Sequence, residues 1–386
     1  MLLIKNGHVI DPLNGIDRVC DLAADGARIL KTGENLPADP KDNVIDASGC
    51  YVVPGLIDHH AHVQPLAKIG LPTEASCFAS GVTAVVDAGS TGCANYIYHQ
   101  GILERLRVNV LAYLNVCTTG LDSLPGCLED VNPAHWDRGA IRECFDRFGQ
   151  KAGGRLVGLK LRTSEPIVKD LGYKVLEETV KLGEELGVSV MVHCTNPPGP
   201  LADLLNLLRP GDTITHMYMN IGPNLLNEKG EVIPEAWEAR ERGVFFEAAD
   251  ARAHFGMPVA HAAIARGFLP DFIATDTTKL SMNLRPTAFS MATQIAKYTA
   301  LGIPFEKVVE CATVNPARQL GLLDRAGSLT IGHPADIAVF RPVDMETVHG
   351  DRPNGVPGQH TIVGHRVYQP VLTVKNGEMV YRDVTF

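Results

Sequence analysis

Short apolar runs alternate with helical stretches through the middle of the chain, and this alternation limits the fold more than any other feature. Lys174–Leu186 and Pro234–Arg242 are two of the helical stretches, and the first has apolar residues at the helical period. Repeated strand–helix units over about 270 residues predict a (β/α)8 TIM barrel, which is an α/β fold. The eight apolar runs are Tyr51–Ile57, Thr83–Asp87, Asn109–Val116, Leu156–Leu161, Ser189–His193, Thr213–His216, Val244–Glu247 and Phe272–Ala274.

The two ends of the chain predict a second, smaller unit. Ile4–Ile10 and Val374–Val380 each place an Asn-Gly pair between β-forming residues, which is typical of a hairpin. We expect both ends to meet in a small β-sandwich domain, formed by residues 1–53 and 328–386, beside a barrel at 54–327. The alternative is an open doubly wound sheet. That fold would need a Gly-rich phosphate turn after its first strand, and the sequence has none there.

Charge and cysteine content narrow the classes of function. Acidic residues outnumber basic ones by 44 to 35, for a net charge of −9, so we expect no nucleic-acid partner. The apolar start of the chain stops at Lys5, and no run of about 18 apolar residues follows, so we expect neither a signal peptide nor a membrane partner. The nine cysteines are odd in number and form no Cys-x-x-Cys pair, which favours a reducing cytoplasmic location over a disulfide framework.

Ionisable side chains follow several of the predicted strands, at the end where the active sites of parallel barrels lie. Residues i and i+2 of a strand point to the same side, so His60 and His62 can both face the barrel axis while His59 points away. Ionisable groups inside apolar runs cost free energy unless something satisfies them, and one shared metal site would satisfy them all. The predicted metal ligands are His60, His62, Lys160, His193, His216 and Asp276.

This order of residues resembles the amidohydrolase superfamily, which has His-x-His after strand 1, Lys after strand 4, His after strands 5 and 6, and Asp after strand 8. The stretches Pro54–Asp58, Ala312–Ala317 and Gly332–Ile337 add to the resemblance, which covers nearly the whole chain. Gly81–Ser90 and Tyr113–Val116 are similar to a dihydroorotase-like deacetylase group of metallohydrolases. Members of that group are linked to hydrolysis of acylated small acids, such as N-acyl amino acids or acetyl esters of α-hydroxy acids.

The resemblance implies a binuclear site with two divalent metal ions, usually zinc. The histidines after strand 1 would bind one ion together with Asp276, and those after strands 5 and 6 would bind the other. Lys160 would bridge both as a carbamate formed with carbon dioxide. A hydroxide shared by the two ions would attack the scissile amide or ester carbonyl. Asp276 would be the catalytic residue, taking the proton of that hydroxide and passing it to the leaving group.

Two departures from related groups bear on the substrate. Dihydroorotases typically carry an Arg two residues after the second His, and Gln64 stands at that position. The deacetylase group tends to carry a His-Gly pair after strand 7, where this chain has Ala248–His254. A cyclic-amide hydrolase of the dihydroorotase or hydantoinase type stays open as an alternative, as does a non-catalytic scaffold on the same fold.

A carboxylate-bearing substrate needs a cation near the metals, and arginine can bind a carboxylate through two hydrogen bonds. Two further side chains beyond strand ends could donate to a substrate oxygen. We therefore expect a small acylated molecule as the partner, and a homo-oligomer stays open. The predicted substrate contacts are Arg162, Arg252, Lys279 and Arg285 as cations, and Tyr218 and His254 as donors.

Overall fold

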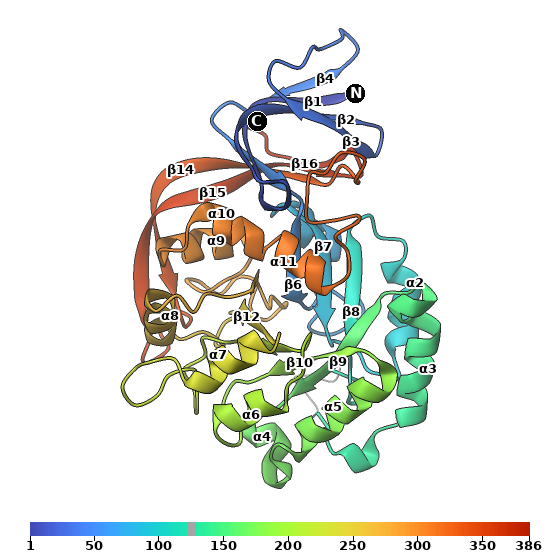
Figure 1. Cartoon of the computed structure of the whole chain (residues 1–386), viewed down its shortest axis with the longest axis vertical. Helices are drawn as coiled ribbons and strands as arrows, with labels where there is room; N and C mark the ends of the chain where they lie inside the picture. The colour runs from blue at the N-terminus through green and yellow to red at the C-terminus, as the bar shows by residue number, and fades with distance from the viewer. Residues whose placement is uncertain (122–128) are drawn as a thin grey trace.

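The computed structural model describes residues 1–121 and 129–386, and a parallel barrel forms its centre (Figure 1). Each barrel strand pairs with the next one along the chain. The barrel closes where its last strand meets its first, and there the backbone N–H of His62 donates to the carbonyl of Thr277 at 3.0 Å. The predicted (β/α)8 barrel is confirmed. Within the described ranges its strands are β6 (Leu56–Ala61), β7 (Val82–Ala88), β8 (Asn109–Asn115), β9 (Leu156–Arg162), β10 (Ser189–His193), β11 (Thr213–Thr215), β12 (Phe245–Ala249) and β13 (Phe272–Ala274).

The two ends of the chain form a second sheet with its own hydrophobic core. Ile4, Val52 and Val374 are 0% exposed in that core, so distant segments pack on one another. The separate β unit built from both termini is confirmed, and its strands belong to one continuous hydrogen-bonded sheet. They are β1 (Leu2–Asp11), β2 (Ile16–Asp25), β3 (Arg28–Gly33), β4 (Asn43–Asp46), β5 (Tyr51–Pro54), β14 (Ile337–Gly350), β15 (Thr361–Lys375) and β16 (Glu378–Arg382).

The first predicted strand, Tyr51–Ile57, is divided between the two sheets. Its first part is β5, which pairs with β1 and β14, and its second part begins β6 of the barrel. Gly55 marks the division. A Cβ at this residue would lie 2.2 Å from the hydroxyl oxygen of Thr83, so only glycine fits where the chain passes from one sheet to the other. The prediction of a single strand here is wrong.

Helices alternate with the barrel strands and cover the outer face of the barrel (Figure 1). The predicted helix Lys174–Leu186 is α5, and it ends because Gly187 adopts left-handed backbone with φ 66°. The predicted helix Pro234–Arg242 is α7, which ends one residue earlier. The helices are α1 (Thr73–Phe78), α2 (Tyr96–Leu103), α3 (Arg138–Phe148), α4 (Glu165–Val168), α5 (Lys174–Leu186), α6 (Leu201–Leu207), α7 (Pro234–Glu241), α8 (Met257–Ala265), α9 (Met291–Ala300), α10 (Phe305–Cys311) and α11 (Val314–Gln319).

The barrel interior changes from apolar to polar along its axis. Ile57, Leu111 and Met191 belong to a buried apolar cluster at the N-terminal side of the strands. His59 and Glu247 follow, and both are 0% exposed. Ionisable side chains therefore occupy the barrel interior toward the C-terminal ends of the strands, where an apolar layer would otherwise fill it.

The sequence expectation that His59 points away from the barrel axis is wrong. Its ring packs inside the barrel, with its centroid 4.4 Å from that of Phe272 and 6.1 Å from that of Tyr113. The pairing of β6 with β7 shifts register between Asp58 and Ala61. A bulge of this kind breaks strict alternation, so His59 and its neighbour both face inward.

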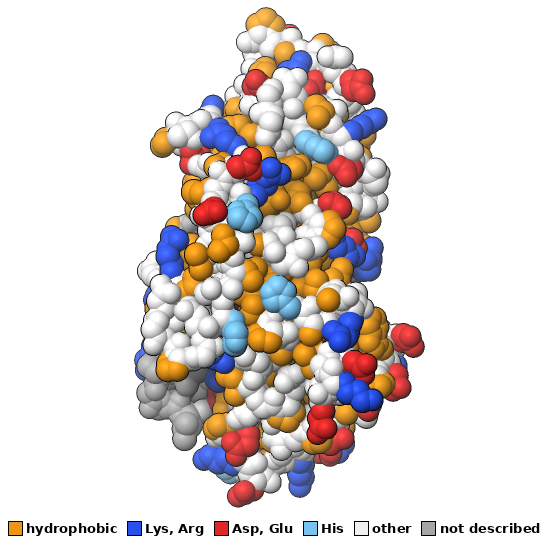
Figure 2. Space-filling view, turned by 90° about the vertical axis from the view of Figure 1, so that its left-hand side faces the viewer, with side chains coloured by type: hydrophobic (Ala, Val, Ile, Leu, Met, Phe, Trp, Pro, Cys, Tyr) orange, Lys and Arg blue, Asp and Glu red, His pale blue; other side chains and the backbone are white. Residues whose placement is uncertain are grey.

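The β14–β15 hairpin runs from the small sheet down the flank of the barrel past α9 (Figure 1). Lys297 of α9 is 1% exposed and forms an ion pair with Asp250 at 3.0 Å. His349 of the hairpin is also buried, at 3% exposed. Figure 2 views this flank, and on it the described hydrophobic side chains are interspersed with charges of both signs.

The described residues include no helix with the length and apolar character needed to cross a membrane. The cysteines within the described ranges are unpaired thiols, and most of them are buried. Cys127 lies outside those ranges.

Acid should weaken the packing of the hairpin through His349. Burial lowers the pKa of His349 to about 4 from its usual 6.5. Between pH 6.5 and 4, His349 is therefore protonated in the unfolded chain but neutral in the folded chain. The free energy of unfolding consequently falls as the pH drops towards 4. We expect the wild type to lose about 2 kcal/mol more than His349→Gln between pH 7 and 4.5, measured by urea unfolding. His365→Gln, at an exposed position of the same hairpin, is the control. Equal losses in all three proteins would contradict the prediction.

Candidate metal centre

A cavity of about 300 Å³ opens at the C-terminal end of the barrel. Described residues at and beyond the ends of seven different strands line it, so positions far apart in the sequence meet there. All six predicted metal ligands are among them. The ionisable residues that line the cavity are His60, His62, Lys160, Arg162, His193, His216, Arg252, His254 and Asp276.

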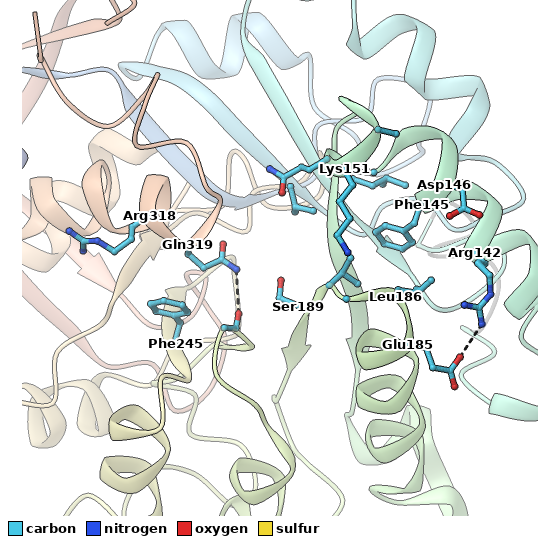
Figure 3. Close-up of a pocket in the computed structure, with 18 of the residues that line it drawn as sticks. Arg142, Phe145, Asp146, Lys151, Glu185, Leu186, Ser189, Phe245, Arg318 and Gln319 are labelled. Carbon is cyan, nitrogen blue, oxygen red and sulfur yellow. Dashed lines mark hydrogen bonds and ion pairs between the residues drawn. The ribbon is translucent and has the colours of Figure 1, made fainter.

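A larger cavity of about 750 Å³ lies at the opposite end of the barrel, where β9 to β12 begin (Figure 3). Arg142 and Glu185 form an ion pair beside it, and Gln319 donates to the carbonyl of Gly211. None of the predicted site residues lines this cavity. Catalytic groups of parallel barrels lie at the C-terminal end, so we assign the candidate site to the smaller cavity.

The two histidines of β6 and its end each donate a hydrogen bond away from the cavity. Nδ1 of His60 lies 2.7 Å from Oε1 of Glu247, and an ionised carboxylate can only accept. Nδ1 of His62 lies 2.9 Å from the hydroxyl of Ser90, whose own hydrogen goes to Asp87. Both Nδ1 atoms therefore carry the proton. Each Nε2 is left as an acceptor that faces the cavity.

Three more imidazoles are held in the same way. Nε2 of His193 lies 3.1 Å from the hydroxyl of Ser164, which itself donates to a backbone carbonyl, so Nδ1 of His193 faces the cavity. Nδ1 of His216 donates to a backbone carbonyl at 2.6 Å. Nδ1 of His254 lies 2.9 Å from the hydroxyl of Thr195. The centroids of these three rings lie 4.4 to 4.8 Å apart.

Asp276 lies between the inward-facing nitrogens. Its Oδ1 is 3.3 Å from Nε2 of His60 and 3.2 Å from Nε2 of His62, and its Oδ2 is 3.9 Å from Nε2 of His216. Burial would raise the pKa of Asp276, but the surrounding imidazoles, His60 above all, hold it well below its usual range. That lowering requires positive charge on the imidazoles. Where their inward nitrogens are neutral acceptors, as the hydrogen bonds on Nδ1 indicate, a cation among them must supply the charge, because acceptor atoms this close otherwise repel one another.

Lys160 contributes a buried amine to the same cavity. It is 1% exposed, and its Nζ has no hydrogen-bond partner among the residues that the structure describes. Burial lowers the pKa of Lys160 to about 8. Gly89 makes room for the side chain, because a Cβ there would lie 2.6 Å from Cβ and Cγ of the lysine. A buried amine without a partner indicates that a further group belongs beside it.

Strained backbone turns two of these side chains into the cavity. His216 has φ 65° and Asp276 has φ 50°, in the left-handed region that residues other than glycine rarely adopt. His216 follows directly after β11, and Asp276 lies two residues after the end of β13. Such conformations cost of order 1 kcal/mol or more and cluster at functional sites. Strand alternation in the sequence cannot reveal them.

The ligand atoms fall into two compact groups among the described residues. His60, His216 and Asp276 bring one ligand atom each within 4.8 Å of the others, and so do His193, His216 and His254. The donor set of imidazole and carboxylate suits zinc and similar divalent ions. His254 thus converges with the predicted ligands, although the sequence suggested only that it could contact substrate.

The predicted substrate contacts divide into those that reach the cavity and those that do not. Arg162 and Arg252 line it, as does His254. Arg162 is paired with Glu129 at 2.8 Å, whereas Arg252 makes no ion pair or hydrogen bond with any described residue. Tyr218 is a correction, because its hydroxyl donates to the carbonyl of Phe268 and its side chain is 1% exposed.

Two more predicted contacts lie outside the cavity. Lys279 is exposed, and only its backbone N–H makes a hydrogen bond, to the carbonyl of Ile69. Arg285 is exposed and stacks its guanidinium over the ring of Phe289, 4.8 Å from the centroid. Neither cation lines the cavity, although Thr278, Leu280 and Ser281 of the same loop do, so a contact of Lys279 or Arg285 with substrate stays a prediction.

The sequence did not identify the residues that hold the imidazoles. Glu247, Ser90, Ser164 and Thr195 come from four separate strands or the loops that follow them. One signal was available for Glu247, which is a charged residue inside the apolar run at 244–249. A buried charge in such a run indicates a partner, but not which partner.

Comparisons with known proteins agree with this arrangement. The family model described as "Amidohydrolase family" matches residues 51–380. A deacetylase from Agrobacterium fabrum is 34% identical over 330 residues, which is 84% of this chain and 78% of that protein. A dihydroorotase crystal structure has a TM-score of 0.87 at 29% identity, covering 99% of this chain and 100% of that one. An adenine deaminase structure has a TM-score of 0.86 at 25% identity, covering 99% of each chain. The chain therefore belongs to the amidohydrolase family and is a hydrolase.

Proposed function

We propose that this hydrolase is metal-dependent and cleaves the amide or ester bond of a small acylated acid. The observation that carries the proposal is the arrangement of five imidazoles that line one cavity, each held by one ring nitrogen, four of which have the other nitrogen within 3.9 Å of the buried carboxylate of Asp276. In metal-binding histidines, a hydrogen bond on the ring nitrogen that faces away from the metal fixes the tautomer. The amidohydrolase family generally uses divalent metals, which fits this chemistry.

The residues of the cavity can be assigned to two ions. The histidines of the β6 end would hold one ion with Asp276, and His193 and His216 would hold the second. Lys160 would bridge both as a carbamate, because a lysine with a pKa of about 8 supplies enough neutral amine to react with carbon dioxide. Divalent ions in such a site acidify water and polarise the scissile carbonyl.

Asp276 is the proposed proton-transfer residue. Its carboxylate lies within 3.2 to 3.9 Å of four inward-facing imidazole nitrogens, at the point where the ligand atoms converge. An ionised carboxylate at this point can accept a proton. It would accept a proton from the attacking water and return it to the leaving amine or alcohol.

Arg252 supports the choice of an acid as substrate. It lines the cavity and has no acidic partner among the described residues, whereas Arg162 is already paired with Glu129. An unpaired guanidinium at the rim of an acceptor-rich cavity can bind a substrate carboxylate through two hydrogen bonds. The cavity volume of about 300 Å³ favours a small molecule. An N-acyl amino acid or an acetylated α-hydroxy acid meets both conditions.

A cyclic-amide hydrolase is the alternative, because a dihydroorotase structure is among the similar folds. Gln64 weighs against it. Its amide is 0% exposed and donates to Asp87 and Thr91, so it does not offer a cation to the cavity. A non-catalytic scaffold is not favoured, since the complete donor set lines the cavity of a hydrolase.

Metal analysis tests the ligand set. We expect about two zinc equivalents per chain in protein loaded with zinc and freed of excess. Lys160→Ala should lose most of the metal and lower kcat/KM by more than about 100-fold, because it removes the bridging group. Lys279→Ala, at an exposed loop lysine, is the control and should behave as wild type. Full activity in metal-free protein would contradict the proposal.

Substrate kinetics test Arg252. Acetylated D- and L-amino acids and acetylated α-hydroxy acids are compared with their neutral primary amides, using zinc-loaded protein. Arg252→Gln should raise KM for the acids by roughly 10- to 100-fold and leave the neutral amides nearly unchanged, because only the acids lose a charged partner. Arg285→Gln, outside the cavity, should change neither. Dihydroorotate and hydantoins are assayed in parallel. Preferential turnover of these cyclic amides would support the alternative.

A further inference from the structure

Two buried side chains, His59 and Glu247, and the partly buried Gln319 form a continuous column below the candidate metal centre. Oε1 of Gln319 lies 3.1 Å from Nε2 of His59, and Nδ1 of His59 lies 2.5 Å from Oε2 of Glu247. Oε1 of Glu247 accepts from Nδ1 of His60 at 2.7 Å. The column runs from the lower cavity of Figure 3, where Gln319 is labelled, to the first predicted metal ligand.

The hydrogen bonds at the lower end fix the orientation of the column. The amide nitrogen of Gln319 donates to the hydroxyl of Tyr113 at 3.0 Å and to the carbonyl of Gly211 at 3.5 Å, so its oxygen faces His59. His59 therefore lies between two oxygen acceptors, one at each ring nitrogen, and holds the side chain of Glu247 in place.

Glu247 is costly to bury without such partners. It is 0% exposed and enters a barrel interior that is apolar just below it. An unpaired carboxylate there would be strongly destabilising. Each of its oxygens has an imidazole partner, His59 on Oε2 and His60 on Oε1, so the carboxylate is fixed at both oxygens.

Glu247 has a direct effect on His60. Because it accepts from Nδ1, the proton of the imidazole is kept on the side away from the cavity, and the Nε2 lone pair faces inward. Thr215 Oγ1 lies 3.0 Å from the same Nδ1, which further fixes the ring. His59 holds the second oxygen of Glu247, so the carboxylate cannot rotate away from His60.

We propose that Glu247, held by its hydrogen bond with His59, positions His60 for metal binding and strengthens it as a ligand. This inference rests on the proposed metal-dependent function. It makes Glu247 and His59 positioning residues, since neither lines the cavity. Other amino acids at these two positions would leave the ligand set intact and still weaken the site.

The test uses Glu247→Gln in the full chain, with Co²⁺ as the probe. The glutamine has nearly the same size, but it can accept from only one of the two imidazoles. We expect Co²⁺ affinity, measured by competition with a chelator, to fall by roughly 10- to 100-fold. The visible absorption bands of bound Co²⁺ should also shift, because the geometry at His60 changes. A residue with only a structural role would lower the melting temperature of the metal-free protein and leave both readouts unchanged.

Two further variants keep the result decisive. His59→Asn retains a donor toward Glu247 but is too short to reach Gln319 as well, so it should lose a smaller part of the affinity. If Glu247→Gln does not fold, the result for His59→Asn decides. Tyr218→Phe removes one buried hydrogen bond of a side chain that does not line the cavity, and it should bind Co²⁺ as wild type does. If Glu247→Gln and His59→Asn fold and bind Co²⁺ with the affinity and spectrum of the wild type, this inference is overturned, but the proposed function is not. Failure of the wild type to bind Co²⁺ would overturn the proposed function as well.

Discussion

Desolvation of ionisable groups is the constraint on which the rest of the structure depends. Lys160, Asp276 and Glu247 are at most 6% exposed, and all three lie toward the C-terminal end of the barrel. In water each would be charged at little cost, but inside the barrel each needs a partner. The imidazoles supply part of that compensation. The inward-facing nitrogen of His216 lacks any hydrogen-bond partner among the described residues, which is the strongest physical argument for a bound cation, and Lys160 Nζ likewise lacks a partner, which indicates that a further group belongs beside it.

The support for this polar centre extends into the rest of the molecule. The loop after β12 carries Arg252 and His254 to the cavity, and Asp250 at its start is anchored by Lys297 and by the hydroxyl of Tyr298. Both partners belong to α9, which the β14–β15 hairpin of the terminal sheet covers. The small sheet therefore contributes to the site indirectly, because it helps to bury the ion pair that holds a wall of the cavity.

Local patterns in the sequence were sufficient to predict the barrel and the ionisable residues that line its cavity. Alternating runs predict parallel strands, and the ends of such strands meet at one face, so the residues after β6, β9, β10, β11 and β13 had to converge. The pattern failed wherever the backbone departs from regular strand geometry. His59 faces inward because of a bulge. Tyr218 faces outward because β11 ends at Thr215 and the chain turns at His216. The partners of the imidazoles depend on contacts between distant strands, which a single sequence does not contain.

Crystals of zinc-loaded protein, measured for anomalous scattering on both sides of the zinc absorption edge, test the central claim most directly. The account predicts two zinc peaks in the cavity at the C-terminal end of the barrel, one beside His60 and one beside His193, with additional density on Lys160 Nζ. Anomalous density only at surface sites, with an empty cavity and a bare lysine, would contradict it.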